Sequence, residues 1–158
     1  MDLYLLRHAQ AEDFAESDFA RRLTEKGEKQ ADKVAKFCRK EKIFPQMILT
    51  SPLERARRTA EILVTQMPGV EWMTVPFLAS GMHPETALAE LAVYKSFERV
   101  MIVGHEPDFS YLIGYLLDQG GSSVASVHVG KASLILLRVV SLRAGGAQLQ
   151  FSIPAKFL

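Results

Sequence analysis

The chain has 158 residues, of which 48% are hydrophobic, and its 19 basic and 18 acidic side chains leave a formal charge of +1. This length and apolar content are typical of one globular domain, so we expect residues 1–158 to fold as a single unit. The near-zero charge argues against nucleic acid or an anionic membrane surface as a partner held by overall attraction. Any anion chemistry must therefore be local.

The single cysteine, Cys38, excludes an internal disulfide and cannot by itself build a zinc site. The first residues carry no basic leader before an apolar core, and Arg7 interrupts the apolar run long before the length of a signal peptide or a membrane span. We therefore expect a cytoplasmic, unprocessed protein without a membrane segment.

Short apolar runs alternate with helical patterns along the chain. Residues 3–6 read as a first buried strand, and a helix is predicted from Thr24, which can cap it. The run 47–49 is a second strand, followed by a helix starting at Pro52, a residue suited to the first helical position. A weaker helix starts at about Pro84, and the strand 100–103 precedes a helix from Pro107.

The C-terminal part of the chain has a different pattern. Residues 133–142 and 148–153, joined across Ala144-Gly145-Gly146, predict a β-hairpin. The whole order predicts an α/β fold, a three-layer sandwich whose central sheet is mostly parallel, with helices on both faces and antiparallel edge strands near the C-terminus. The connections after the strands look short, so we expect an open site without a lid.

Charged side chains follow directly after the predicted parallel strands. The first strand delivers Arg7-His8-Ala9, the second leads into Ser51-Pro52-Leu53-Glu54-Arg55, and a later one ends at Gly104-His105. Ligands of such folds bind beyond the carboxyl ends of the strands, so these residues should meet at one rim. Each of them alone is more often structural or solvated, but their joint placement indicates a site. Two arginine forks beside helix N-termini suit a phosphate.

The position of Arg55 suits that interpretation, because a side chain one turn into its helix leans back towards the end of the first strand. The same pocket would be cationic and would repel a divalent metal, and the four histidines lack the spacing of zinc ligands. Cys38 has no arginine six residues on, and Ser51 lacks the glycines of a serine-hydrolase elbow. Histidine as a nucleophile remains, and the residues alone leave open which histidine serves.

Three motifs carry a resemblance to a known family. In order they are Arg7-His8-Ala9, Ser51-Pro52-Leu53-Glu54-Arg55-Ala56 and Gly104-His105, and together they resemble the histidine phosphatase superfamily, also called phosphoglycerate mutase-like. The segment Arg21-Arg22-Leu23-Thr24-Glu25-Lys26-Gly27 is similar to the Arg-Pro-Leu-Thr-x-x-Gly of the small SixA-type branch, with Arg22 in place of the proline. That branch acts on protein phosphohistidine.

The resemblance implies a role for each matched residue and no metal or other cofactor. His8 would be the nucleophile that becomes phosphorylated, while Arg7 and Arg55 clamp phosphoryl oxygens and His105 donates to the same group. Arg21 would be a further phosphate contact. The implied partner is a phosphohistidine-containing protein, such as a phosphorelay protein.

One departure concerns the proton donor for the leaving group. Many phosphoester-hydrolysing relatives carry a glutamate soon after the third strand, whereas residues 77–83 here contain no carboxylate. The weak substitutes are Glu85, Glu106, Asp108 and His83. Three hypotheses follow: a phosphohistidine phosphatase, a phosphatase of small phosphoesters such as sugar phosphates, and a noncatalytic module that binds phosphoproteins.

Overall fold

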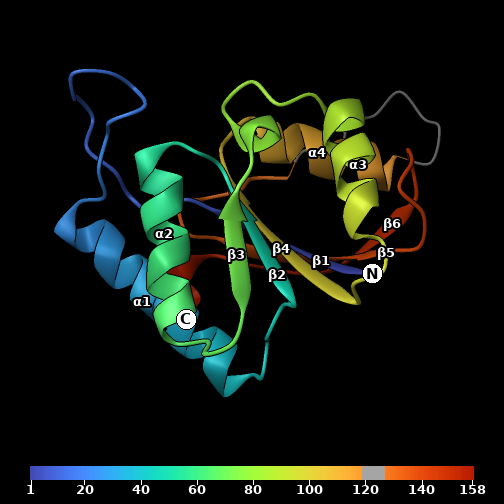
Figure 1. The fold of residues 1–158 in the computed structure, drawn as a ribbon, viewed down its shortest axis with the longest axis horizontal. Coiled ribbons are helices and arrows are strands. Elements are labelled where there is room, and N and C mark those ends of the chain that lie inside the picture. Colours follow the sequence, from blue (N-terminus) through green and yellow to red (C-terminus); the bar gives the residue numbers. More distant parts are fainter. Residues whose placement is uncertain (119–126) are drawn as a thin grey trace.

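The computed structural model describes residues 1–118 and 127–158. Within them, a six-stranded sheet has the strand order β3-β2-β4-β1-β5-β6 (Figure 1). The four parallel strands are β1 (Asp2–Arg7), β2 (Met47–Thr50), β3 (Glu71–Thr74) and β4 (Arg99–Gly104). The hairpin of β5 (Leu134–Val139) and β6 (Ala147–Ile153) joins β1 in the antiparallel direction. The predicted fold class is confirmed.

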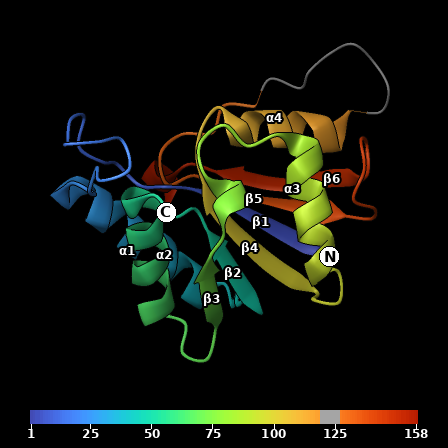
Figure 2. The ribbon, with the colours of Figure 1, turned by 45° about the horizontal axis from the view of Figure 1, so that its top comes forward.

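Helices cover both faces of the sheet (Figure 2). Alternate residues of β1 point to opposite sides, so Leu3 and Leu5 join one buried cluster while Tyr4 and Leu6 join the other. Helices α1 (Glu25–Lys40) and α2 (Glu54–Thr65) pack on the Tyr4 face, and α3 (Pro84–Leu91) and α4 (Asp108–Leu117) pack on the Leu3 face. Within the described residues, no helix combines the length and apolarity needed to cross a bilayer.

Two of the four helix starts agree with the sequence and two are shifted. Helix α1 is capped by Thr24 as predicted, with Gly27 N donating to Thr24 Oγ1 at 3.1 Å. Helix α3 begins at Pro84, but α4 begins at Asp108 rather than Pro107.

Helix α2 begins at Glu54, two residues later than predicted, because Leu53 stays extended and its N–H donates to Ser51 Oγ at 3.2 Å. Arg55 therefore lies in the first turn of α2. The prediction that placed it one turn into the helix is wrong.

Two segments differ from expectation for physical reasons. The edge strand β3 has mostly exposed side chains, so it contains no buried apolar run by which it could be recognised. Residues 8–24 connect β1 to α1, and residues 12–19 of this connection are exposed. An isolated antiparallel bridge between Ala11 and Leu23 joins the two ends of this exposed segment. The prediction of uniformly short connections is therefore wrong for the first one, which lies beside the predicted site.

Candidate active site

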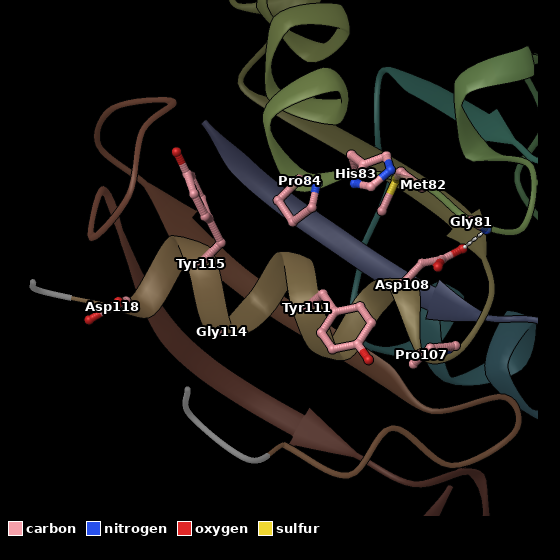
Figure 3. Close-up of a pocket in the computed structure, with 10 residues that line it drawn as sticks. All are labelled: Gly81, Met82, His83, Pro84, Pro107, Asp108, Tyr111, Gly114, Tyr115 and Asp118. Atoms are coloured by element: carbon pink, nitrogen blue, oxygen red, sulfur yellow. Dashed lines mark hydrogen bonds between the residues drawn. The ribbon is translucent and has the colours of Figure 1, made fainter. Parts of the chain in front are cut away.

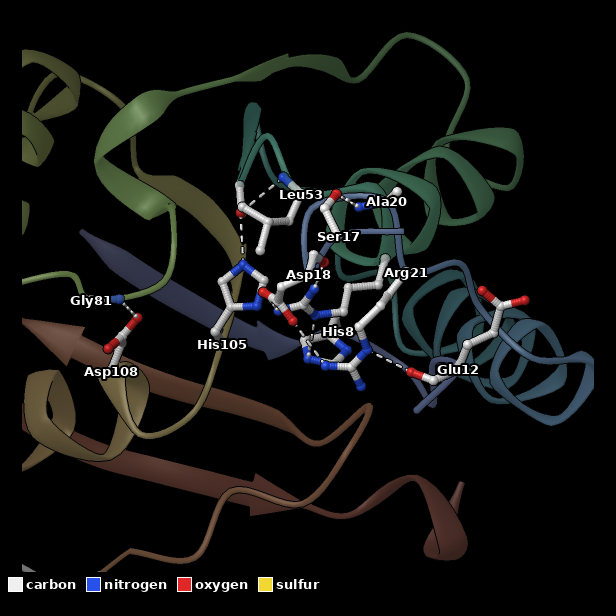
Figure 4. Close-up of polar contacts among 12 residues, drawn as sticks. His8, Glu12, Ser17, Asp18, Ala20, Arg21, Leu53, Gly81, His105 and Asp108 are labelled. Carbon is white, nitrogen blue, oxygen red and sulfur yellow. Dashed lines mark hydrogen bonds and ion pairs between the residues drawn. The ribbon is translucent and has the colours of Figure 1, made fainter. Parts of the chain in front are cut away.

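Strand register brings the predicted residues together at one end of the sheet. Arg7 of β1 pairs with Gly104 of β4, and Thr50 of β2 pairs with Val103 of β4. The residues that follow these positions must therefore be neighbours. The ring centroids of His8 and His105 lie 5.2 Å apart, which brings residues from two strands into one site (Figure 4).

His8 is buried, with one ring nitrogen acting as a donor and the other as an acceptor. Its Nδ1 lies 2.8 Å from the carbonyl oxygen of Ala9, so Nδ1 carries the hydrogen and donates it. Nε2 then holds a lone pair, which accepts a hydrogen bond from Arg55 Nε at 3.3 Å. Burial lowers the pKa of His8 to about 3, although the bond to Ala9 acts in the opposite direction. The ring is therefore neutral at pH 7.

His105 has the complementary arrangement. Its Nε2 lies 2.7 Å from Ser51 Oγ, which already accepts the N–H of Leu53. The Ser51 hydroxyl can donate its own hydrogen to His105, which places the hydrogen of the neutral ring on Nδ1. Burial lowers the pKa of His105 to about 4, with Arg55 acting in the same direction. Among the described residues, no group accepts from this buried Nδ1.

The two predicted arginines reach the same place. Arg55 is buried, with Nε directed at His8 and its two terminal nitrogens bonded to Asp18. Arg7 donates from Nη1 to the carbonyl oxygen of Val129 at 2.8 Å, while its buried Nε has no partner in the described part of the chain. Burial lowers the pKa of Arg7. Four groups from β1, α2 and the end of β4 thus form a cluster rich in hydrogen-bond donors.

Arg21 is linked to this cluster through Asp18, and its contacts are with protein groups. Its Nε donates to the carbonyl oxygen of Glu12 at 2.6 Å, and its Nη1 pairs with Asp18 Oδ1 at 3.0 Å (Figure 4). Asp18 is a site residue that sequence reasoning missed. The only signal for it was an acid three residues before Arg21, which is too common to single out.

The four weak candidates for a proton donor are exposed or hydrogen-bonded to other groups, although Glu106 lies close enough to Arg7 to act on the pKa of that arginine in the raising direction. Asp108 is buried and accepts the N–H of Gly81 at 2.9 Å, and Glu106 accepts the hydroxyl of Ser110 at 2.8 Å. Glu85 and His83 are exposed at the start of α3. In the described part of the chain, none of the four is hydrogen-bonded to His8 or His105.

Two hollows flank the site. A cavity of about 380 Å³ lies next to Arg7 and is lined also by Glu106, Ser110 and His128. A larger one of about 640 Å³ lies between the start of α3 and the length of α4, where Tyr111, Tyr115 and prolines make its wall largely apolar (Figure 3). In the part of the chain that the structure describes, no three His, Cys, Asp or Glu side chains gather as metal ligands.

Comparisons with known proteins identify similar sequences and folds. The sequence model described as the histidine phosphatase superfamily (branch 1) matches residues 3–79. An uncharacterized protein of Picosynechococcus sp. (strain ATCC 27264 / PCC 7002 / PR-6) is 34% identical over 159 residues, which cover 95% of this chain and 89% of that protein.

Solved structures are similar over nearly the whole chain. A SixA protein of Agrobacterium tumefaciens is 25% identical with a TM-score of 0.83, and 97% of each chain is covered. The protein histidine phosphatase SixA complexed with tungstate has a TM-score of 0.85 at 20% identity, with 99% of each chain covered. The alpha-ribazole phosphatase of Shigella flexneri has a TM-score of 0.77 at 20% identity, covering 98% of this chain and 97% of that one.

Proposed function

This chain belongs to the histidine phosphatase superfamily and is a phosphatase of the SixA type, and from that premise we propose that it removes phosphate from a phosphohistidine side chain of a partner protein through a phospho-His8 intermediate. The observation that carries the proposal is the neutral His8 ring, whose Nε2 lone pair lies beside Arg55 while Nδ1 donates to Ala9. A nucleophilic imidazole needs this protonation state.

Phosphoryl transfer would proceed in two balanced steps. The Nε2 lone pair of His8 attacks phosphorus, and the bond from phosphorus to the substrate ring nitrogen breaks with its electron pair going to that ring. Water then attacks the phosphorus of phospho-His8, and the bond from phosphorus to Nε2 breaks with its electron pair returning to the ring. His8 leaves as a neutral imidazole that has kept its Nδ1 hydrogen, and the hydrogens of the water stay on the released phosphate or pass to the solvent. Arg7 Nε, His105 Nδ1 and Arg55 are the donors for the phosphoryl oxygens, and the two arginines neutralise the negative charge of these oxygens.

The lack of an evident proton donor supports phosphohistidine over an alkyl phosphoester. An alkoxide leaves poorly unless an acid protonates it, whereas a phosphohistidine whose other ring nitrogen is protonated releases a neutral imidazole. The carboxylate nearest to Arg55 is that of Asp18. Burial alone would raise the pKa of Asp18, but hydrogen bonds from Arg21 and Arg55 lower it overall. An ionised carboxylate held by two arginines is a poor acid.

Exposed apolar side chains beside the site favour a protein as the partner. Phe14 is 91% exposed and Phe19 is 56% exposed, and both lie on the segment that also carries Asp18. Large apolar side chains in contact with water are features that a protein surface can cover. The alternative of a small phosphoester draws support from the likeness to alpha-ribazole phosphatase, which concerns the fold.

The test compares kcat/KM for a phosphohistidine protein, para-nitrophenyl phosphate and glycerol phosphate on one preparation. We expect the phosphohistidine protein to be the best substrate, the activated aryl phosphate second and glycerol phosphate poor. Phe14→Ser should raise KM for the protein substrate alone. His8→Ala should retain less than a few per cent of activity on every substrate.

Two results would replace the proposal. Glycerol phosphate turned over as fast as the phosphohistidine protein would reveal a proton donor and favour small phosphoesters. Binding of phosphoprotein with no phosphate release at high enzyme concentration would favour a noncatalytic module.

A further inference from the structure

An exposed segment contacts a buried arginine of the site. Residues 12–19 lie between β1 and α1 on the surface, and the carboxylate of Asp18 is 58% exposed. Its partner is nevertheless Arg55, whose side chain is only 5% exposed. The carbonyl oxygen of Asp18 accepts from Arg55 Nη1 at 2.7 Å, and Oδ2 accepts from Nη2 at 3.0 Å. Two oxygens of one residue therefore hold one guanidinium.

The contact with Asp18 determines which donors of the Arg55 guanidinium remain for a phosphoryl group. A guanidinium offers one pair of donors at its end, from the two terminal nitrogens, and another pair along its edge, from Nε and Nη2. Asp18 accepts from both terminal nitrogens and so occupies the end. The edge that contains Nε faces His8, with 3.3 Å between Arg55 Nε and His8 Nε2. A phosphoryl group on His8 would meet this edge.

Arg21 holds the other oxygen of the same carboxylate. Its Nη1 lies 3.0 Å from Asp18 Oδ1, and its Nε is itself fixed by the carbonyl oxygen of Glu12. The next residue, Phe19, accepts the N–H of Glu54 at 3.1 Å, which ties the segment to the first residue of α2. Asp18 is thus held from two sides, between Arg21 and the start of the helix that carries Arg55 (Figure 4).

We propose that Asp18 is a positioning residue, which orients the Nε edge of Arg55 towards the phosphoryl group on His8, and that Arg21 acts on the reaction through Asp18. The proposal rests on the proposed function, in which Arg55 binds the phosphoryl oxygens. It assigns Arg21 a role different from the direct phosphate contact that the family resemblance implies. A competing role for Asp18, as an anion that phosphate must displace, makes the opposite prediction for phosphate binding.

The test is a double-mutant cycle with Asp18→Ala, Arg21→Ala and the double variant, assayed with para-nitrophenyl phosphate. Asp18→Ala should lower kcat about 100-fold with little change in KM, because a misaligned Arg55 loses contacts that strengthen in the transition state. The double variant should be no slower than Asp18→Ala. Asp18→Asn, which keeps one oxygen for Arg55, should recover part of the activity. Asp13→Ala removes an exposed acid from the same segment and should match the wild type.

Affinity for inorganic phosphate, measured by calorimetry, completes the experiment. Asp18→Ala should bind phosphate no more tightly than wild type and should still unfold cooperatively in urea. Three results would overturn the inference: tighter phosphate binding by Asp18→Ala, unchanged kcat, or losses in the two single variants that multiply in the double one. Activity that survives in His8→Ala would instead refute the proposed function, so the two failures are distinguishable.

Discussion

At the scale of single residues, the site depends on which ring nitrogen of each histidine carries a hydrogen. The carbonyl of Ala9 places it on Nδ1 of His8, and the hydroxyl of Ser51 can place it on Nδ1 of His105. The two histidines then play opposite hydrogen-bonding roles in the site, since Nε2 of His8 offers a lone pair and Nδ1 of His105 offers a donor. A backbone carbonyl and a serine hydroxyl set this difference.

Ser51 can be tested directly. In Ser51→Ala, His105 loses the hydroxyl that orients its ring, and we expect kcat/KM to fall about 10- to 100-fold, the range found when a residue that orients a functional histidine is removed. Ser51→Thr keeps a hydroxyl and should retain most of the activity. Steady-state kinetics of both variants with para-nitrophenyl phosphate decide the matter, and equal rates for alanine and wild type would contradict the assigned tautomer.

At the scale of elements, the start of α1 holds the chain that follows β1. The carbonyl oxygen of Gln10 accepts the N–H of Thr24, the cap of α1. Gly27, in the first turn of the helix, lies so close to Gln10 that a Cβ at position 27 would be 1.9 Å from the same carbonyl oxygen. Helix and catalytic strand end are therefore in direct backbone contact, two residues after His8.

Gly27→Ala should consequently damage both stability and catalysis. Alanine favours helices, but here its methyl group must push the Gln10 backbone away, and overpacking of this kind costs about 1–3 kcal/mol. Urea unfolding should show the loss of stability, and kcat/KM should fall because the backbone next to His8 moves. The neighbouring exposed residue provides the control, Lys26→Ala, which should resemble the wild type. A Gly27→Ala variant more stable than wild type would mean that the contact can relax freely.

At the scale of the whole molecule, the net charge is close to zero although basic side chains gather at the site. Arg7, Arg55 and two histidines lie together at one end of the sheet, while the net charge is only +1. The fold keeps both rings uncharged, because burial lowers the pKa of His8 to about 3 and that of His105 to about 4. In the unfolded chain an imidazole protonates near pH 6.5, so the unfolded state takes up protons first as the pH falls.

Stability should therefore fall as the pH is lowered from 7 towards 5. The folded-state pKa values lie below the unfolded value, so the unfolded state binds more protons in this range and each histidine costs about 2 kcal/mol. Urea unfolding at pH 7 and pH 5 measures the difference. His105→Asn should reduce the loss by about that amount, whereas Lys26→Ala, which removes an exposed side chain and no histidine, should leave it unchanged. A loss of equal size in His105→Asn and wild type would contradict the buried neutral state.

The sequence by itself determined those features of the protein that depend on short stretches of residues. Continuous apolar runs mark strands buried on both faces, Thr24 and Pro84 mark helix starts, and the motif residues directly after β1, β2 and β4 must meet because parallel strands end at one edge. The layers and the meeting of His8, Arg55 and His105 follow from these signals. The edge strand β3 did not, because its exposed side chains carry no such pattern.

The tertiary structure alone decided the contacts that tune the site. Asp18 and Arg55 are 37 residues apart, and Ser51 and His105 are 54 apart, so no local pattern could pair them. The site, predicted to be open, lies beside an exposed segment, and Arg21 forms an ion pair with Asp18 of that segment. Both features follow from the path of residues 8–24, which depends on contact with α2. Hydrogen-bond partners and burial, which set the pKa values of both histidines, exist only once the chain has folded.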